Sequence, residues 1–162
     1  MTVRKATFAD LEEILKIYEG ARSFMRKSGN PTQWQGGYPY PEIVRADIES
    51  SVLHVIEEDG ELYGVFAFIT SGDPDYANID GAWLNDLPYA VIHRVASAGK
   101  RGGMLRVCVE YCLSKASNLK IDTHEDNIPM QNGLERLGFV RCGKVYLVRA
   151  GERIAYQLCK EQ

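Results

Sequence analysis

The chain has 162 residues, of which 45% are hydrophobic and 25% are charged, and its formal net charge is −3. This length and composition are typical of one packed globular domain, which we assign to residues 1–162. The sequence lacks the basic excess of a nucleic-acid-binding protein, an apolar run long enough to span a bilayer, and a signal peptide. We therefore expect a cytoplasmic protein that binds neither nucleic acid nor membrane.

The four cysteines form no C-x-x-C pair, which in an intracellular chain favours reduced thiols. Cys108 and Cys112 are one helical turn apart, but no second pair at zinc-like spacing accompanies them. We expect both to be buried on a core helix, and we expect no metal site.

The first half of the chain predicts a strand, two helices and a hairpin. Thr7-Phe8-Ala9-Asp10 has the pattern of a capping box at the start of a helix. Pro41 suits the first position of a second helix, where its missing N–H would have no partner. Asp59-Gly60 favours a tight turn between two strands. The predicted segments are strand 2–6, a helix from residue 11, a helix from residue 41, strands 52–56 and 62–70, and a polar loop at 71–86.

The second half predicts alternating strands and helices before a closing hairpin. In order, the segments are strand 89–96, helix 102–116, strand 119–123, helix 129–137, and strands 139–147 and 153–158. The central strand–helix–strand unit favours a parallel pair, and the hairpins impose antiparallel pairing elsewhere. We expect an α/β (α+β) fold with a mixed, mostly antiparallel sheet of about seven strands and helices on both faces.

A turn rich in glycine and basic residues opens the helix at residue 102. Free N–H groups and the helix dipole at such a position favour an anion. Gly102 and Gly103 would let a ligand approach the backbone, while Lys100 and Arg101 would add positive charge. A pyrophosphate is the simplest ligand for this turn, although a Gly-Gly pair before a helix is often only a loop. The P-loop and dinucleotide-binding patterns are both absent.

A later segment bears on whether the turn at residues 100–105 binds a ligand. Asn127, a short helix and Gly138-Phe139 follow the next strand. Together with the turn at 100–105, this order resembles the Gcn5-related N-acetyltransferase (GNAT) superfamily. The resemblance covers nearly the whole chain and is sharpest over residues 89–146. It implies a GNAT fold in which a parallel strand pair splays apart to hold acetyl-CoA, the co-substrate.

Three positions depart from the family pattern. Lys100 stands where Gln or Arg is usual, and it keeps a long polar donor. Leu105 stands where Gly or Ala is usual in the pyrophosphate turn, and Leu134 stands where a tyrosine commonly protonates the departing thiolate. The resemblance implies that the cofactor is bound by Val95, Ala96, Ser97, Lys100, Arg101, Gly102, Gly103, Met104 and Asn127.

Acetyl transfer to an amine needs a base, an oxyanion donor and a proton for the thiolate. The Val95 amide is the expected oxyanion donor. Histidine titrates near neutrality, which makes His93 and His124 the candidate bases, although each could instead be a packing residue. Tyr146 is a candidate acid, with Glu110 or a water chain as further options.

Aromatic side chains in two loops are candidates for the acceptor pocket, because they offer apolar walls with polar tips. They could equally pin the loops onto the sheet. The candidates are Trp34, Tyr38, Tyr76 and Trp83.

We expect an acetyl-CoA-dependent N-acetyltransferase that acts on the amine of a small molecule or peptide, as a monomer or homodimer. Two alternatives remain open at this point. One is a GNAT-like sensor that binds CoA or a metabolite without turnover. The other is an acyltransferase that uses a longer acyl-CoA or a protein N-terminus.

Overall fold

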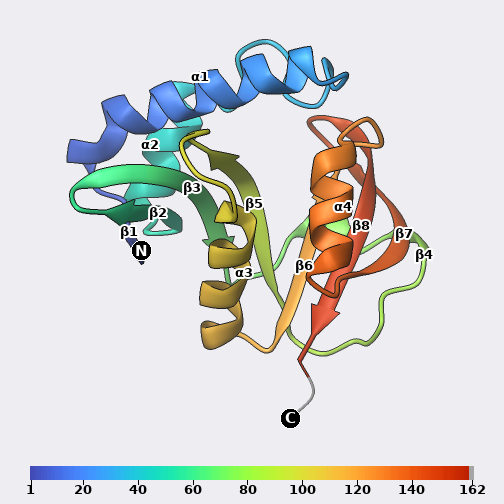
Figure 1. Cartoon of the computed structure of the whole chain (residues 1–162). Coiled ribbons are helices and arrows are strands. Elements are labelled where there is room, and N and C mark those ends of the chain that lie inside the picture. Colours follow the sequence, from blue (N-terminus) through green and yellow to red (C-terminus); the bar gives the residue numbers. More distant parts are fainter. Residues whose placement is uncertain (161–162) are drawn as a thin grey trace.

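Eight strands form a single sheet in the computed structural model, which describes residues 1–160 (Figure 1). The strands are β1 (Thr2–Lys5), β2 (Leu53–Glu58), β3 (Glu61–Ile69), β4 (Ile79–Gly81), β5 (Ala90–Ser97), β6 (Asn118–Thr123), β7 (Val140–Leu147) and β8 (Gly151–Cys159). Their order across the sheet is β1-β2-β3-β5-β6-β8-β7-β4, and β5–β6 is the parallel pair. The other neighbouring pairs are antiparallel. The predicted mixed, mostly antiparallel sheet is confirmed.

The additional strand is β4, which lies inside the predicted polar loop and pairs with β7 at the sheet edge. Two glycines make this pairing possible. Gly81 and Gly143 are register partners with φ of 129° and 144°. A Cβ atom on either glycine would clash with the backbone of the opposite strand. Polar composition pointed to a loop, whereas the close approach of two distant glycines produces a short strand.

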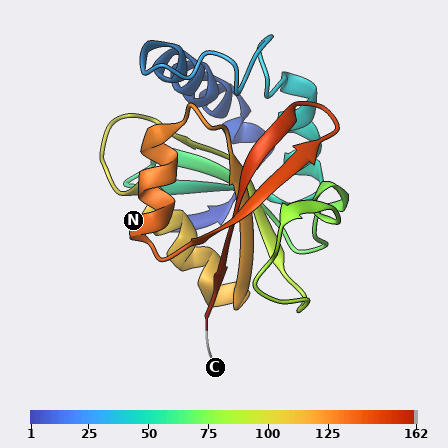
Figure 2. The ribbon, with the colours of Figure 1, turned by 90° about the vertical axis from the view of Figure 1, so that its right-hand side faces the viewer.

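The helices are α1 (Leu11–Lys27), α2 (Pro41–Glu49), α3 (Met104–Lys115) and α4 (Ile128–Arg136). The capping box predicted at Thr7 and Asp10 is present, and Pro41 is the first residue of α2. Figure 2 shows α4 on one side of the β7–β8 hairpin and the segment that carries β4 on the other. Within residues 1–160, no helix is both long and apolar enough to cross a membrane.

Alternating side chains of the sheet feed two hydrophobic cores. Val55, Val65 and Ala67 belong to the core beneath α1 and α2. Ile56 and Phe66, on the opposite face, belong to the core beneath α3 and α4. Because successive side chains in a strand point to opposite faces, one strand supplies both cores. Helices therefore cover both faces, as predicted.

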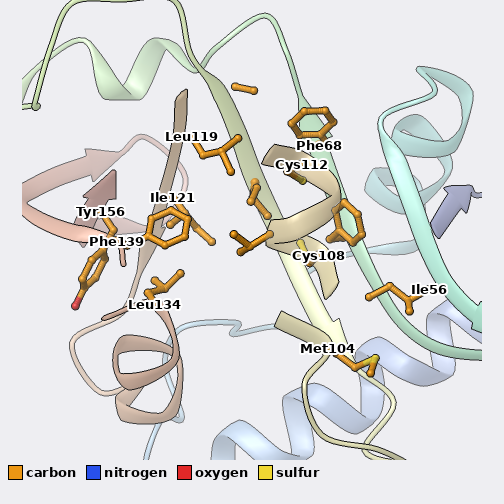
Figure 3. Close-up of a cluster of buried hydrophobic side chains, with 14 of the residues drawn as sticks. Ile56, Phe68, Met104, Cys108, Cys112, Leu119, Ile121, Leu134, Phe139 and Tyr156 are labelled. Carbon is orange, nitrogen blue, oxygen red and sulfur yellow. The ribbon is translucent and has the colours of Figure 1, made fainter. Parts of the chain in front are cut away.

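Figure 3 shows the second core, in which Cys108 and Cys112 of α3 pack near Phe68 and Leu119. Both cysteines are fully buried, and burial raises the pKa of the Cys108 thiol. Among residues 1–160, no group of three or more His, Cys, Asp or Glu side chains is placed to hold a metal ion. These two cysteines therefore serve as small core residues.

The parallel pair β5–β6 is joined only near its start. Ala90 pairs with Leu119 and Val91 with Lys120, after which the strands separate (Figure 1). This is the splay that the family resemblance implied. Beyond Val91 and Lys120, the two strands are therefore not joined by backbone pairing.

Candidate functional site

The turn before α3 presents free backbone N–H groups. Gly103 is the N-cap residue with φ of 85°, a left-handed conformation that favours glycine. The N–H of Val107 makes the first intrahelical bond, to the Gly103 carbonyl, so the amides of residues 104–106 have no acceptor within the helix. A Cβ atom at Gly99, Gly102 or Gly103 would meet nothing within 4 Å, so the space beside the turn is open. The turn can therefore accommodate a phosphate group.

The two basic residues of this turn point toward the β2–β3 hairpin. Arg101 donates to Glu58 at 2.8 Å, and the Lys100 ammonium lies 3.6 Å from Glu61. Both cations also lie beside the ring of Tyr63. In this conformation the two side chains face the hairpin, and the groups left free at the turn are its backbone amides.

An apolar cavity of about 390 Å³ lies next to the turn, between α1, the end of β5 and the starts of α3 and α4. Five of the predicted cofactor residues line it, namely Val95, Ala96, Ser97, Met104 and Asn127. We call it the cofactor cavity. Its second wall is the α1 surface formed by Gly20, Ala21, Phe24 and Met25. That wall was not predicted, because apolar residues at helical spacing look the same whether they face a core or a cavity.

Leu105, which departs from the family pattern, packs against α4. A Cβ atom at Gly133 would lie 2.9 Å from Cδ2 of Leu105. The missing side chain at Gly133 thus makes room for the larger residue on α3. Leu105 also lines the cofactor cavity.

A β-bulge separates the two ends of β5. Opposite it, the register with β3 jumps between Val65 and Ala67, and Arg94 has φ of 52°. The Arg94 carbonyl accepts the Tyr18 hydroxyl at 2.8 Å, and its guanidinium binds Asp47 of α2 through two bonds of 2.7 and 3.0 Å. Helices α1 and α2 therefore hold the bulge in place from one side.

A smaller cavity of about 40 Å³ lies in the splay itself, and we call it the central cavity. Val95, Met25, Asn127 and Met130 line both this cavity and the cofactor cavity, so the two adjoin. Asn127 caps α4 by accepting the Met130 amide and donates to Gln33. Asn127 thus stands directly before the first residue of α4, where a side chain that accepts a backbone amide stabilises the helix start.

His93 lies where the central cavity meets a third, outer cavity of about 380 Å³. Its Nε2 is 2.7 Å from Oδ2 of Asp73, and its Nδ1 is 3.8 Å from Oδ2 of Asp122. The hydrogen bond from His93 lowers the pKa of Asp73, although partial burial opposes the shift. An ionised Asp73 accepts the Nε2–H and leaves Nδ1 as the ring nitrogen able to take a proton.

The other catalytic candidates lie away from the central cavity. His124 Nδ1 accepts the Asp126 amide within its own turn, and its Nε2 lies 3.1 Å from the hydroxyl of Thr32 in the loop between α1 and α2, so both ring nitrogens have partners. Tyr146 is 69% exposed on β7 and lines none of the three cavities. Leu134 is fully buried in the core, which leaves no hydroxyl at that position.

The four aromatic candidates divide into two groups. Trp34 lines the central cavity, and the ring of Tyr38 packs edge-on against the ring of Trp34. Tyr76 and Trp83 contact each other in the opposite loop and line none of the three cavities. Tyr76 nevertheless acts on the site, because its hydroxyl donates to Asp122 at 2.5 Å.

Asp73 and Asp122 were not singled out by sequence reasoning. Asp73 sits in an acidic loop whose simplest interpretation is a solvated surface. Its neighbour Pro74 starts a short 3₁₀ turn at Pro74–Tyr76, and this turn directs Asp73 toward His93. The only available signal was the position of Asp122 near the end of a strand that splays.

No protein-family model matches the sequence, and no curated protein matches it. Solved structures do match. A GNAT-family acetyltransferase from Streptococcus agalactiae 2603 is 33% identical, with 99% of this chain and 96% of that chain covered and a TM-score of 0.88. GNAT-family acetyltransferases from Bacillus cereus ATCC 10987 and Listeria monocytogenes 4b F2365 share the fold at 20% and 19% identity, with TM-scores of 0.66 and 0.71. The Bacillus match covers 99% of this chain and 98% of that one, and the Listeria match covers 96% and 92%.

The match to the Streptococcus structure extends over the whole sheet, including the splayed pair and the turn before α3. The resemblance first recognised in short sequence segments is thereby confirmed. The chain belongs to the GNAT family of acetyltransferases.

Proposed function

We propose that the protein transfers an acetyl group from acetyl-CoA to the amine of a small molecule or peptide. The observation that supports this proposal is that three cavities adjoin one another where β5 and β6 separate. The cofactor cavity shares Val95 with the central cavity, and the central cavity shares His93 with the outer cavity. A thioester entering from the α3 side and an amine entering from the opposite side would meet beside His93.

The residues of the cofactor cavity fit the parts of acetyl-CoA. The open turn at residues 99–103 suits the pyrophosphate, and the apolar walls of α1 and α4 suit the pantetheine arm. Acetyl-CoA would supply the acetyl group as an activated thioester. Around that group, the chain would contribute the Val95 amide as a donor to the developing oxyanion.

The amine must lose its proton before or during attack. His93 is suited to this task because Asp73 holds its Nε2–H and its Nδ1 faces the splay. Asp122, which is 3.8 Å from Nδ1, would stabilise the imidazolium that forms. Proximity in the central cavity would carry much of the remaining rate enhancement, because a thiolate is a good leaving group.

Titration calorimetry with acetyl-CoA, followed by an assay of thiol release across an amine panel, tests the proposal. We expect micromolar binding and CoA release with at least one amine. Gly103→Glu should abolish binding while circular dichroism shows an intact fold, because it places a carboxylate beside the anion site. Absence of acetyl-CoA binding at hundreds of micromolar would contradict the proposal.

The two histidines can be separated in the same assay. His93→Gln should lower kcat by about 100-fold or more, the usual contribution of a general base. His124→Gln should have a much smaller effect, because both of its ring nitrogens already have partners, the Asp126 amide and the Thr32 hydroxyl. A larger loss in His124→Gln than in His93→Gln would show that the base is misassigned.

A further inference from the structure

Two arginines on the β7–β8 hairpin line the central cavity without a carboxylate partner. Arg149 lies in the turn and Arg153 lies in β8. No Asp or Glu within residues 1–160 forms a salt bridge with either guanidinium. Arg153 is only 4% exposed and donates to the backbone carbonyls of Ala150, Glu152 and Gln33.

These three bonds leave Arg153 with unused donors. A guanidinium carries five N–H groups, so two of those on Arg153, which lines the central cavity, remain without an acceptor among residues 1–160. Burial lowers the pKa of Arg153, and the nearby charge of Arg149 acts in the same direction, whereas Asp122 opposes the shift. A buried cation that lacks a direct counter-ion is costly, and an anion bound in the cavity would reduce that cost.

Arg149 extends the same positive wall outward. Its guanidinium carbon lies 3.8 Å from the centroid of the Tyr38 ring, and this stacking fixes the plane of the fork. Arg149 lines both the central and the outer cavity. An arginine held in this way presents its remaining donors to a carboxylate in the geometry of a paired hydrogen bond.

Acidic side chains lie near the two arginines, because β6, which carries Asp122, pairs directly with β8, which carries Arg153. Asp122 is 6% exposed at its side chain and accepts the hydroxyl of Tyr76. Burial raises the pKa of Tyr76 well above its usual range, so the hydroxyl keeps its proton and donates. Asp122, with His93 and Asp73 beside it, would attract an amine, and the neighbouring Arg149 and Arg153 would attract an anion.

We propose that the acceptor is a small amino acid, whose carboxylate is held by Arg149 and Arg153 while its amine faces His93 and Asp122. This inference rests on the proposed acetyl transfer and adds the chemical class of the acceptor. The central cavity admits only the reacting end of the molecule, and the outer cavity of about 380 Å³ takes the side chain. Its apolar lining by Ile69, Pro74 and Leu147 suits a side chain of moderate size.

The test compares each amino acid of a panel with its carboxamide and its decarboxylated amine. Rates of CoA release are expressed per concentration of unprotonated amine, because the three compounds differ in basicity. We expect kcat/KM to be at least about tenfold higher for the best acids than for their matched neutral compounds. Arg149→Gln should remove most of this preference, because it should raise KM for the acids by a larger factor than KM for the carboxamides.

Lys144→Gln is the matched control, because Lys144 is a partly exposed cation on the same hairpin that pairs with Glu152 and lines neither cavity. It should leave the preference intact. Equal or faster turnover of the neutral compounds would overturn the amino-acid proposal and leave acetyl transfer standing. If no amine releases CoA, titration calorimetry compares the binding affinity of each amino acid with that of its carboxamide. Equal affinity for an acid and its carboxamide would then overturn the proposal.

Discussion

Replacing Asp47 should destabilise the protein and impair catalysis, although Asp47 lines none of the three cavities. Asp47 holds Arg94 through two hydrogen bonds, and both side chains are nearly buried at 11% and 13% exposure. Removing one partner from a buried ion pair costs about 3–5 kcal/mol, because the other charge is left without compensation. We expect Asp47→Asn to lie near the lower end of that range, because the amide oxygen still accepts one bond.

For a domain of this size, a loss of about 3 kcal/mol lowers Tm by about 6–12 °C. Urea denaturation and calorimetry measure the change. The variant should also lower kcat by about tenfold or more, because the left-handed conformation at Arg94 sets the positions of His93 and Val95 on either side of the bulge.

Glu152→Gln is the control, since Glu152 forms an exposed pair with Lys144 and should contribute less than about 1 kcal/mol. If Asp47→Asn is no more destabilising than this control, the bulge does not depend on α2. Unchanged kcat would show that the bulge does not position the reacting groups.

Two further predictions concern packing and pH. Gly133→Ala should change stability little, because the gain in helix propensity of about 1 kcal/mol opposes the contact with Leu105. In a Leu105→Ala background the same change should stabilise the protein by about 1 kcal/mol, and equal effects in both backgrounds would contradict this contact. The hydrogen bond from Arg4 lowers the pKa of Asp10. The ionised Asp10 therefore stabilises the folded protein above about pH 4, and this stabilisation is lost as pH falls through the lowered pKa. Asp10→Asn should therefore flatten the acid decline of stability in urea titrations between about pH 2 and pH 5, and an unchanged decline would refute the linkage.

Local patterns were sufficient for most of the fold. The capping box at Thr7, the proline at the start of α2 and the Asp59-Gly60 turn depend on neighbouring residues, and the structure contains each of them. β4 escaped prediction because it exists only where Gly81 meets Gly143, residues far apart in the chain. Pairing of this kind leaves no periodic pattern in either segment.

The candidate site likewise contains some features that could be predicted from neighbouring residues and others that could not. The turn at Gly103 and the cap at Asn127 could be predicted, because a helix start creates free amides wherever it occurs. His93 could be named as a candidate, but the sequence could not separate it from His124. That choice depends on Asp73, which only the 3₁₀ turn after it brings within 2.7 Å.

The sequence by itself determined the element order, the glycine turn that opens α3 and the family, because these depend on residues close together in the chain. Only the tertiary structure decided which charges face one another across the splay. Arg149 and Arg153 line the same cavity as Asp122 because β8 of the closing hairpin pairs with β6. The chemistry of the acceptor is therefore a property of the folded chain, since it depends on side chains that no local pattern connects.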